Sequence, residues 1–232
     1  MNGSDPKKTV CVSVIIPTIN EGASLGIVID SIKHVLENAG ISYEIIIVDS
    51  DSIDDTKSIA ESRNVKFVTE HKRGYGVAYK RGFKEASGSW IVTMDGDNTY
   101  DPAVIPDAIN KATFNGWVFV SFKRIKQKGS MSFKHRIGNF ILTVAMIVLF
   151  GIKIRDSQSG MWLIKKEFLD RFALISDTMP FSEEIKIEGF KHFKAAELPV
   201  NYYPRIGTPK LMSWRDGWLN LKFLFRKRFL GN

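Results

Sequence analysis

Residues 90–97 read WIVTMDGD, an apolar run that passes directly into an acidic turn. Two earlier runs have the same form. Residues 10–16 (VCVSVII) are followed by Pro17, and residues 43–48 (YEIIIV) are followed by the polar cluster DSDS at 49–52. Apolar runs of this length without alternation are typical of strands that are covered on both faces, as in a parallel sheet. We therefore predict three buried strands, each of which ends in polar residues.

Helical segments are expected between these strands. Apolar residues recur at helical spacing from Ser24, a candidate N-cap, to about residue 38, and Gly40 is expected to end this helix. The other elements expected in this half are a helix at 55–62, a strand at 65–68, a helix ending near 86, a helix after Pro102 and a strand at 117–122. This alternation predicts an α/β fold with a doubly wound, mostly parallel sheet. Ligands of such sheets bind beyond the carboxyl ends of the strands, which is where the polar clusters lie.

The second half of the chain has a different pattern. A basic segment at 123–136 precedes a run without charged residues at 137–152. A helix that spans a membrane needs about 20 apolar residues, so this run is too short to span. We expect either a buried core helix or a helix that lies in a membrane interface. A strand at 161–164 and a helix at 182–192 are expected beyond it.

The composition is that of a folded, basic protein. Of 232 residues, 44% are hydrophobic, and the formal net charge is +8. These values exclude disorder as the main state, and the single Cys11 excludes an internal disulfide framework. The charge favours an anionic partner, and three kinds fit: nucleic acid, a phosphate-bearing substrate or an anionic membrane. Residues 1–9 lack the apolar core of a secretory signal, so we expect an uncleaved cytoplasmic protein.

The last part of the chain, residues 211–232, combines aromatic and basic side chains. Residues 219–230 read LNLKFLFRKRFL. This pattern indicates either a basic helix on an anionic membrane surface or a helix packed on the domain. Trp214 and Trp218 fit both interpretations.

Asp95 and Asp97 place two carboxylates on either side of Gly96 at the end of a predicted strand. Mg²⁺ prefers oxygen ligands and is often held by one or two carboxylates together with substrate phosphates. A Mg²⁺ or Mn²⁺ ion at this position would bridge the protein to a diphosphate and stabilise charge on the leaving group. Gly96 would let the ligand approach the main chain. The alternative is an ordinary acidic turn.

Other polar residues at the strand ends suit the rest of a nucleotide. Asn20 and Glu21 follow the first strand, and acceptors at 49–51 follow the second. They can bind a nucleobase edge and ribose hydroxyls, or they can form turns and cap helices. Gly74 and Gly76 precede a helix and would let main-chain N–H groups face a phosphate. The segment matches neither a P-loop nor the dinucleotide-binding fingerprint.

The order of several motifs resembles the family 2 glycosyltransferases of the GT-A fold. These motifs are VSVIIPTINEG, IIIVDSDSIDDT, GYGVAYKRGF, VTMDGDNTYDP, RDSQSG, FSEEIKIE and ELPVNYYPRIGTPK. The chain looks most like the polyprenyl-phosphate branch, the dolichyl-phosphate mannose, glucose and N-acetylglucosamine synthases. The resemblance implies a GT-A domain over residues 1–210, with a nucleotide-binding first half and an acceptor-side second half. Residues 211–232 would then form an appended, membrane-associated tail.

The resemblance also implies the positions of the donor and metal sites. The nucleoside site would be lined by Pro17, Ile19 and Glu21, with Val48 beside the base. Asp95, Gly96 and Asp97 would meet the diphosphate and the metal. Thr99 stands where mannose synthases use a Gln as a further metal ligand. Ser50 stands where those enzymes carry an Asp that contacts the base, and Asp49 or Asp51 would substitute for it.

The acceptor side follows from the same resemblance. Arg124 and Arg205 would face the donor and acceptor phosphates, and Lys210 would follow in the next loop. Glu184 matches an acidic residue on a helix near the acceptor. Because an acceptor phosphate is already ionised near neutral pH, we expect Glu184 to orient the acceptor and not to act as a base. Arg side chains would offset the repulsion between two phosphate-bearing substrates.

The implied function is transfer, with inversion, of a hexose or N-acetylhexosamine from a UDP- or GDP-sugar to dolichyl phosphate for protein glycosylation. It would take place on the cytoplasmic face of a membrane and would use Mg²⁺ or Mn²⁺. One alternative keeps the fold but makes the acceptor a glycan hydroxyl. Another is a non-catalytic module that binds nucleic acid, but no nucleic-acid-binding signature supports it and we expect no such partner.

Overall fold

The computed structural model describes residues 11–207 and 213–230, and it contains a seven-stranded sheet in the order β3-β2-β1-β4-β6-β5-β7. The strands are β1 (Val12–Thr18), β2 (Tyr43–Asp49), β3 (Lys66–Thr69), β4 (Trp90–Thr93), β5 (Phe119–Lys126), β6 (Trp162–Lys165) and β7 (Ala195–Tyr202). β1 to β4 run parallel to one another, β7 is parallel to β5, and β6 is antiparallel to both β4 and β5. The predicted doubly wound, mostly parallel α/β sheet is confirmed.

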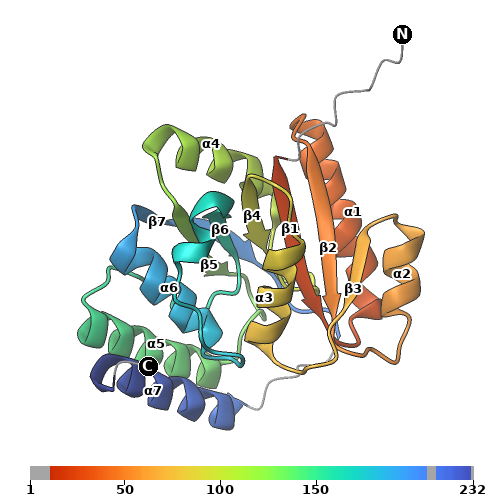
Figure 1. Ribbon diagram of the computed structural model, residues 1–232. Helices are drawn as coiled ribbons and strands as arrows, with labels where there is room; N and C mark the ends of the chain where they lie inside the picture. The colour runs from red at the N-terminus through yellow and green to blue at the C-terminus, as the bar shows by residue number, and fades with distance from the viewer. Residues whose placement is uncertain (1–10, 208–212, 231–232) are drawn as a thin grey trace.

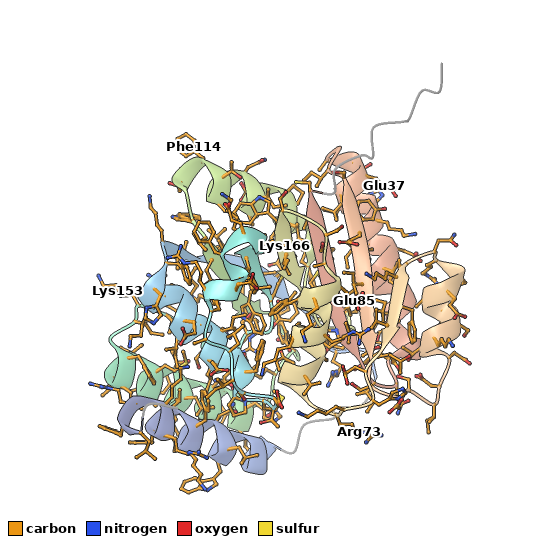
Figure 2. All side chains as sticks on the ribbon, in the orientation of Figure 1. Glu37, Arg73, Glu85, Phe114, Lys153 and Lys166 are labelled. Carbon is orange, nitrogen blue, oxygen red and sulfur yellow. The ribbon has the colours of Figure 1, made fainter. Side chains whose placement is uncertain are left out.

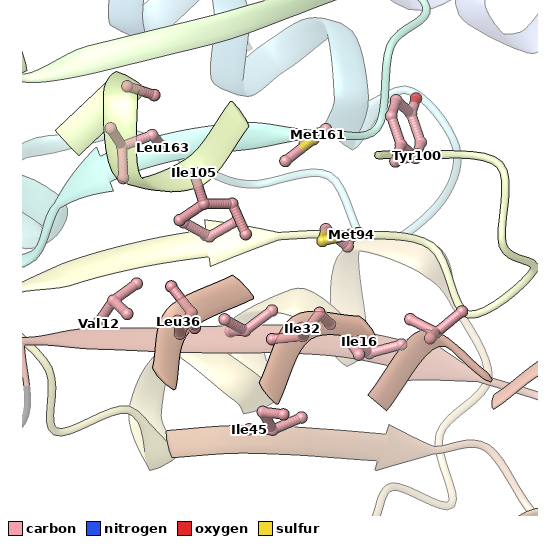
Figure 3. Close-up of a cluster of buried hydrophobic side chains, with 14 of the residues drawn as sticks. Val12, Ile16, Ile32, Leu36, Ile45, Met94, Tyr100, Ile105, Met161 and Leu163 are labelled. Atoms are coloured by element: carbon pink, nitrogen blue, oxygen red, sulfur yellow. The ribbon is translucent and has the colours of Figure 1, made fainter. Parts of the chain in front are cut away.

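Helices cover both faces of this sheet (Figure 1). They are α1 (Gly22–Asn38), α2 (Thr56–Ser62), α3 (Tyr75–Glu85), α4 (Ile105–Asn115), α5 (Phe133–Phe150), α6 (Phe181–His192) and α7 (Ser213–Phe229), with short 3₁₀ segments η1 (Pro102–Val104) and η2 (Lys166–Arg171). The face under α1 and α4 contains one core cluster, which includes Ile16, Ile32 and Ile105 (Figure 3). The opposite face, under α3 and α6, contains a second cluster that includes Tyr79, Trp162 and Phe181.

The start of α1 differs from the prediction. The helix begins at Gly22 with Glu21 as its N-cap, so the prediction of Ser24 as the cap was wrong. Ser24 lies inside the first turn, and its hydroxyl donates to the main-chain oxygen of Gly96 at 2.7 Å. The other end is as predicted, because Gly40 follows the last turn with a φ of 65°. The first turn of α1 therefore holds the acidic loop after β4.

The apolar run of the second half forms α5, which extends to Phe133. Among the described residues, α5 is the one helix long and apolar enough to cross a membrane by length and composition alone, so the prediction that this run is too short to span was wrong by that measure. Only 17% of this helix is buried. The alternative of a buried core helix is therefore wrong. A few inner residues, such as Leu142 and Met146, join Ile187 of α6 and Leu224 of α7 in a third core cluster. The C-terminal helix α7 thus packs on the domain through this cluster.

Candidate active site

The polar residues after β1, β2 and β4 converge, as predicted, at one edge of the sheet. The Thr18 hydroxyl donates to Asp49 Oδ1 at 2.8 Å, and the main-chain N–H of Asn20 donates to Ser52 Oγ at 2.7 Å. The contact between Ser24 and Gly96 joins the loop after β4 to the same group. Because β1 lies between β2 and β4, the two flanking loops meet on either side of the first one.

Asp95 and Asp97 form the acidic centre of this edge. Burial and then the negative charge of Asp97 raise the pKa of Asp95 to about 7, although Arg205 and Arg124 oppose the shift. Asp97 is 4% exposed, and its Oδ1 accepts hydrogen bonds from the main-chain N–H and the hydroxyl of Thr99 at 3.1 and 2.6 Å. The two carboxylates therefore repel each other in a partly desolvated setting, which a divalent cation would relieve.

This arrangement fits a metal that binds through the protein and its substrate together. Among the described residues, no group of three or more His, Cys, Asp or Glu side chains could hold a metal ion. Two carboxylates completed by diphosphate oxygens are a common site for Mg²⁺. Asp95 and Asp97 are the residues that would hold the ion. The hydroxyl of Thr99 is bound to Asp97, so Thr99 supports a candidate ligand, and its own role as a ligand stays a prediction.

Arg205 lies against the same carboxylates. Its Nε is 2.9 Å from Asp97 Oδ2, and its Nη2 is 3.5 Å from Glu21 Oε1. The segment after β7 holds it there, since the N–H of Tyr203 donates to the Thr99 oxygen at 2.8 Å and that of Ile206 donates to the Asp97 oxygen at 3.0 Å. The structure therefore brings together four predicted site residues, which are Glu21, Asp97, Thr99 and Arg205. Lys210 lies outside the described residues.

Gly160 approaches Asp95 from the other side. A Cβ atom at this position would lie 2.8 Å from the Tyr75 hydroxyl and 3.1 Å from Asp95 Oδ1, so no larger residue fits without a shift. Tyr100 fixes the turn, because its hydroxyl accepts the N–H of Gly160 at 2.7 Å. The segment RDSQSG therefore forms one wall of the acidic site.

Arg124 is held in a buried ion pair. Its Nε and Nη2 donate to the two carboxylate oxygens of Asp156, each at 2.7 Å. Burial raises the pKa of Asp156, but the charge and hydrogen bonds of Arg124 outweigh it and lower that pKa to about 2. Arg124 thus fixes the loop that carries Gly160. Its contact with a substrate phosphate stays a prediction.

The residues at and after the end of β2 that were predicted to bind the nucleoside differ in their contacts within the protein. The carboxylate of Asp49 binds Thr18 and accepts from the N–H and hydroxyl of Ser52, so it forms the turn, as the alternative interpretation held. Asp51 has a φ of 56° and lies 2.8 Å from His71 Nδ1. Val48 is fully buried under α3, so only its main chain can face a nucleoside.

Three further residues predicted to bind the nucleoside lie at this edge of the sheet. Pro17 and Ile19 are half-buried, and Ser50 is 9% exposed. The N–H of Ser50 donates to the Thr18 oxygen at 2.9 Å, which ties the loop after β2 to that after β1. Their contacts with a nucleoside stay predictions.

At the glycine-rich start of α3, two main-chain amides already have a partner within the protein. The N–H groups of Gly76 and Val77 donate to the main-chain oxygen of Asp177 at 3.0 and 3.2 Å. The prediction that the amide of Gly76 faces a phosphate was therefore wrong, and for Gly74 it stays a prediction. The loop before α6 covers this helix end.

The contacts of Glu184 are with the loop before α6 and with α7. It is fully buried, accepts the N–H of Ser176 at 2.8 Å and lies 3.2 Å from Lys227 Nζ of α7. Its neighbour Glu183 turns toward the RDSQSG segment, where Oε1 accepts from Gln158 Nε2 at 2.8 Å. Burial raises the pKa of Glu183 to about 8. The role of Glu184 at the acceptor stays a prediction, and Glu183 is the acidic residue of α6 that contacts the wall of the site.

Sequence reasoning missed a buried polar network around this wall. Lys186 is fully buried, and its Nζ donates to the oxygens of Ser159 and Ser182 at 2.6 and 2.8 Å. Burial lowers the pKa of Lys186 to about 7. Gln158 accepts from Asn220 of α7 at 3.1 Å. Apart from Asn220, the polar residues of this network lie in two of the motifs named earlier, RDSQSG and FSEEIKIE. The sequence does not show which of these side chains point toward one another.

Comparisons with known proteins agree with this geometry. Residues 13–172 match the family described as glycosyl transferase family 2. The chain is 34% identical over 225 residues to a dolichol-phosphate mannosyltransferase of Pyrococcus furiosus, covering 93% of this chain and 63% of that protein. It is 31% identical to a low-salt glycan biosynthesis hexosyltransferase of Haloferax volcanii, covering 91% of this chain and 52% of that protein.

The chain thus spans about half to two thirds of the length of these two relatives. It covers 88% of a third, a dolichyl-phosphate hexose transferase of Haloferax volcanii, at 28% identity. Glucosyl-3-phosphoglycerate synthase of Mycobacterium tuberculosis has a similar fold, with a TM-score of 0.76 at 22% identity over 94% of this chain and 80% of that chain. That enzyme has been solved with Mn²⁺, UDP-glucose and phosphoglyceric acid. The sequence match and the strand order lead to one conclusion: this chain belongs to glycosyltransferase family 2 and has the GT-A fold.

Proposed function

We propose that the protein transfers a hexose or N-acetylhexosamine from a UDP- or GDP-sugar to the phosphate of dolichyl or another polyprenyl phosphate. The observation that carries the lipid acceptor is the exposed apolar face of α5. The names of two relatives, which act on dolichol or dolichyl phosphate, support the same acceptor class. Donor and metal are supported by complexes of the similar synthase with UDP and Mn²⁺ or Mg²⁺.

The donor diphosphate would bind at the edge formed by Asp95, Asp97 and Arg205. A divalent cation held by the two carboxylates would neutralise charge on the departing nucleoside diphosphate. Arg205 is 26% exposed, so its guanidinium can reach both the buried carboxylates and an anion in the open part of the site. Arginine suits this task because its planar group binds two oxygens at once.

The acceptor phosphate would attack the anomeric carbon directly. It is ionised near neutral pH, so no side chain has to remove a proton. Direct attack opposite the leaving group would invert the anomeric configuration. The residues of the chain would therefore orient and neutralise, and the Arg124–Asp156 pair would fix the wall against which the sugar lies.

The apolar face of α5 would rest on the membrane that holds the acceptor. Its exposed large residues are Phe133, Ile137, Phe140, Ile141, Val144, Ile147 and Val148. An apolar patch of this extent is unusual on a protein surface that faces water. Exposed basic residues of α7, including Lys222, Arg226 and Arg228, lie on the helix packed beside α5. Each basic residue near an anionic surface contributes about 1 kcal/mol.

The proposal includes a peripheral position on the cytoplasmic face of a membrane, where the lipid phosphate and the nucleotide-sugar meet. A buried network joins this helix pair to the acidic site. Thr143 of α5 contacts Ser157, and Asn220 of α7 contacts Gln158, in the loop that ends at Gly160. The acceptor phosphate of a lipid lying along α5 would therefore approach the wall of the donor site.

The test is a transfer assay with three acceptors. Purified protein with Mn²⁺ receives radiolabelled UDP-glucose, UDP-N-acetylglucosamine or GDP-mannose, together with dolichyl phosphate in vesicles, 3-phosphoglycerate or a soluble glycan. We expect label in the chloroform-soluble fraction with one of these donors and the lipid. Label only in the phosphoglycerate or glycan reactions would reject the lipid acceptor and keep the glycosyltransferase.

A further inference from the structure

Arg205 lies where a divalent cation would bind the carboxylate of Asp97. Thr99 occupies Oδ1 of Asp97, and the guanidinium of Arg205 lies 2.9 Å from Oδ2. Both oxygens of the carboxylate are therefore engaged within the protein. A cation at Oδ2 would compete with the guanidinium for this oxygen and would be repelled by its positive charge.

The contact between Arg205 and Asp97 is Coulombic and has no hydrogen-bond alignment. In the described part of the chain, Nε of Arg205 is buried without a hydrogen-bond partner, although Asp97 Oδ2 is close to it. Pairs of arginine and carboxylate frequently form two aligned hydrogen bonds, as Arg124 does with Asp156. The comparison within one molecule marks the Arg205 contact as the one that is poorly bonded and easily exchanged.

The main chain nevertheless keeps Arg205 at this place. The N–H groups of Tyr203 and Ile206, on either side of it, donate to main-chain oxygens of Thr99 and Asp97. When the guanidinium leaves Asp97, its Cα therefore stays next to the acidic loop. The side chain would then bind a nearby anion, and in this site that anion is the diphosphate of the donor.

We propose that Arg205 is the counter-ion of Asp97 in the donor-free protein and that it makes cation binding depend on the diphosphate. This inference rests on the proposed function, since it takes the acidic loop as the site of the cation and the diphosphate. A cation alone displaces the guanidinium from Asp97 and leaves it only the longer contact with Glu21, whose Oε1 lies 3.5 Å from Nη2. A cation that arrives with a nucleoside diphosphate supplies that partner. The wild-type protein would bind Mn²⁺ weakly alone and tightly with UDP.

The test is the affinity for Mn²⁺ in the absence of nucleotide, measured from the free-ion signal in electron paramagnetic resonance. The Arg205→Met variant keeps the length of the side chain and removes its charge. We expect it to bind Mn²⁺ alone roughly tenfold more tightly than wild type, and to lose most of the increase in affinity that UDP gives wild type. The Arg205→Lys variant keeps a positive charge and should resemble wild type.

The control for general electrostatics is Lys111→Met, which removes one positive charge from an exposed pair on α4. It should leave Mn²⁺ binding unchanged. Equal or weaker binding of Mn²⁺ alone by a folded Arg205→Met protein would overturn the proposal. If that variant does not fold, a crystal structure of the wild type with Mn²⁺ and inorganic pyrophosphate decides. The proposal requires the guanidinium to have left Asp97, and an intact pair beside the bound ion would refute it.

The two proposals fail in different ways. If wild type transfers sugar to lipid while Arg205→Met leaves Mn²⁺ affinity unchanged, the counter-ion role is wrong and the proposed function stands. If no donor gives transfer to any acceptor while the Mn²⁺ result is as expected, the proposed function is wrong and the counter-ion role of Arg205 stands.

Discussion

The two halves of the molecule differ in where their charged and apolar side chains lie, although both have an apolar core. The half from β1 to β4 buries apolar side chains such as Ile15, Ile46 and Val92, and its polar residues gather at the strand ends. The half from β5 to α7 buries Lys186 and Glu183 completely, while Phe140 and Val148 of α5 are 68% and 75% exposed. Apolar surface of this kind is costly in water and is a feature of interaction sites. The first half follows the usual rule for a soluble domain, and the second half has the surface expected beside an apolar neighbour.

The largest expected effect tests the first half. Asp97→Asn keeps the shape of the side chain and its bond to Thr99 but removes the charge that a cation needs. Turnover should fall about a thousandfold, because loss of metal stabilisation costs several kcal/mol and each 1.4 kcal/mol is a factor of ten. The measurement is steady-state transfer with saturating donor. Asp107→Asn, on the surface of α4, is the control and should keep wild-type turnover.

The second test breaks the buried pair that supports the second half. Asp156→Asn leaves Arg124 buried with no counter-charge, and we expect the free energy of unfolding in urea to fall by about 3–5 kcal/mol. Asp30→Asn breaks an ion pair with Arg63 in which the Asp30 carboxylate is 59% exposed. This change should alter stability by less than about 1 kcal/mol. Equal losses in the two variants would show that the buried pair has no special role.

The third test concerns the outer surface of the second half. The double change Phe140→Ser with Val148→Ser should weaken binding to anionic vesicles roughly 10- to 100-fold. Side chains at an interface are only partly buried, so the two together lose less than the roughly 1.5–3 kcal/mol that each contributes when fully buried. Both residues are exposed, so unfolding should change by only about 0.5 kcal/mol. Phe114→Ser is the control, because Phe114 is 91% exposed at the end of α4, away from α5 and α7 (Figure 2). Vesicle sedimentation that is the same for all three proteins would contradict the membrane surface.

The smallest effect concerns the buried carboxyl of Glu183. Its folded pKa is raised from 4.5 to about 8, so between these values the folded protein holds a proton that the unfolded chain releases. Stability from this group is therefore present at low pH and is lost as pH rises through that window. Glu183→Gln remains neutral and should gain in melting temperature relative to wild type from about pH 5 to pH 7. Below pH 7, Lys186, whose pKa is lowered to about 7, is largely protonated in both the folded and the unfolded chain, so it adds little pH dependence in this range. A difference that does not change with pH would show that Glu183 is not neutral when folded.

The first half could be predicted because its signals are local. Each strand is a continuous apolar run, and the residues that follow it belong to the site, as with Asp95 and Asp97 after β4. The second half depends on long-range pairing. Strand β7 contains Glu197 and Pro199, which are unfavourable in strands, so the local sequence does not predict a strand there. The strand is defined by its parallel pairing with β5.

Some single residues could not be assigned for similar reasons. Glu183 and Glu184 are adjacent on α6, yet one contacts the wall of the site and the other contacts α7. Nothing in the local pattern decides between them. Ser24 fits a capping pattern, but the helix begins earlier with Glu21 as its N-cap. The hydroxyl of Ser24 donates instead to the main-chain oxygen of Gly96.

The contact of Lys227 with α6 determines how the C-terminus can be studied. Its Nζ lies 3.2 Å from Glu184 and 3.0 Å from Glu188, both of which are buried. A protein shortened before Leu224 would lose this lysine as well, so two acids would lack their shared cation and the apolar cluster that Leu224 joins would be uncovered. Such a truncation reports on folding, and point changes on the outer face of α7 are the ones that report on lipid.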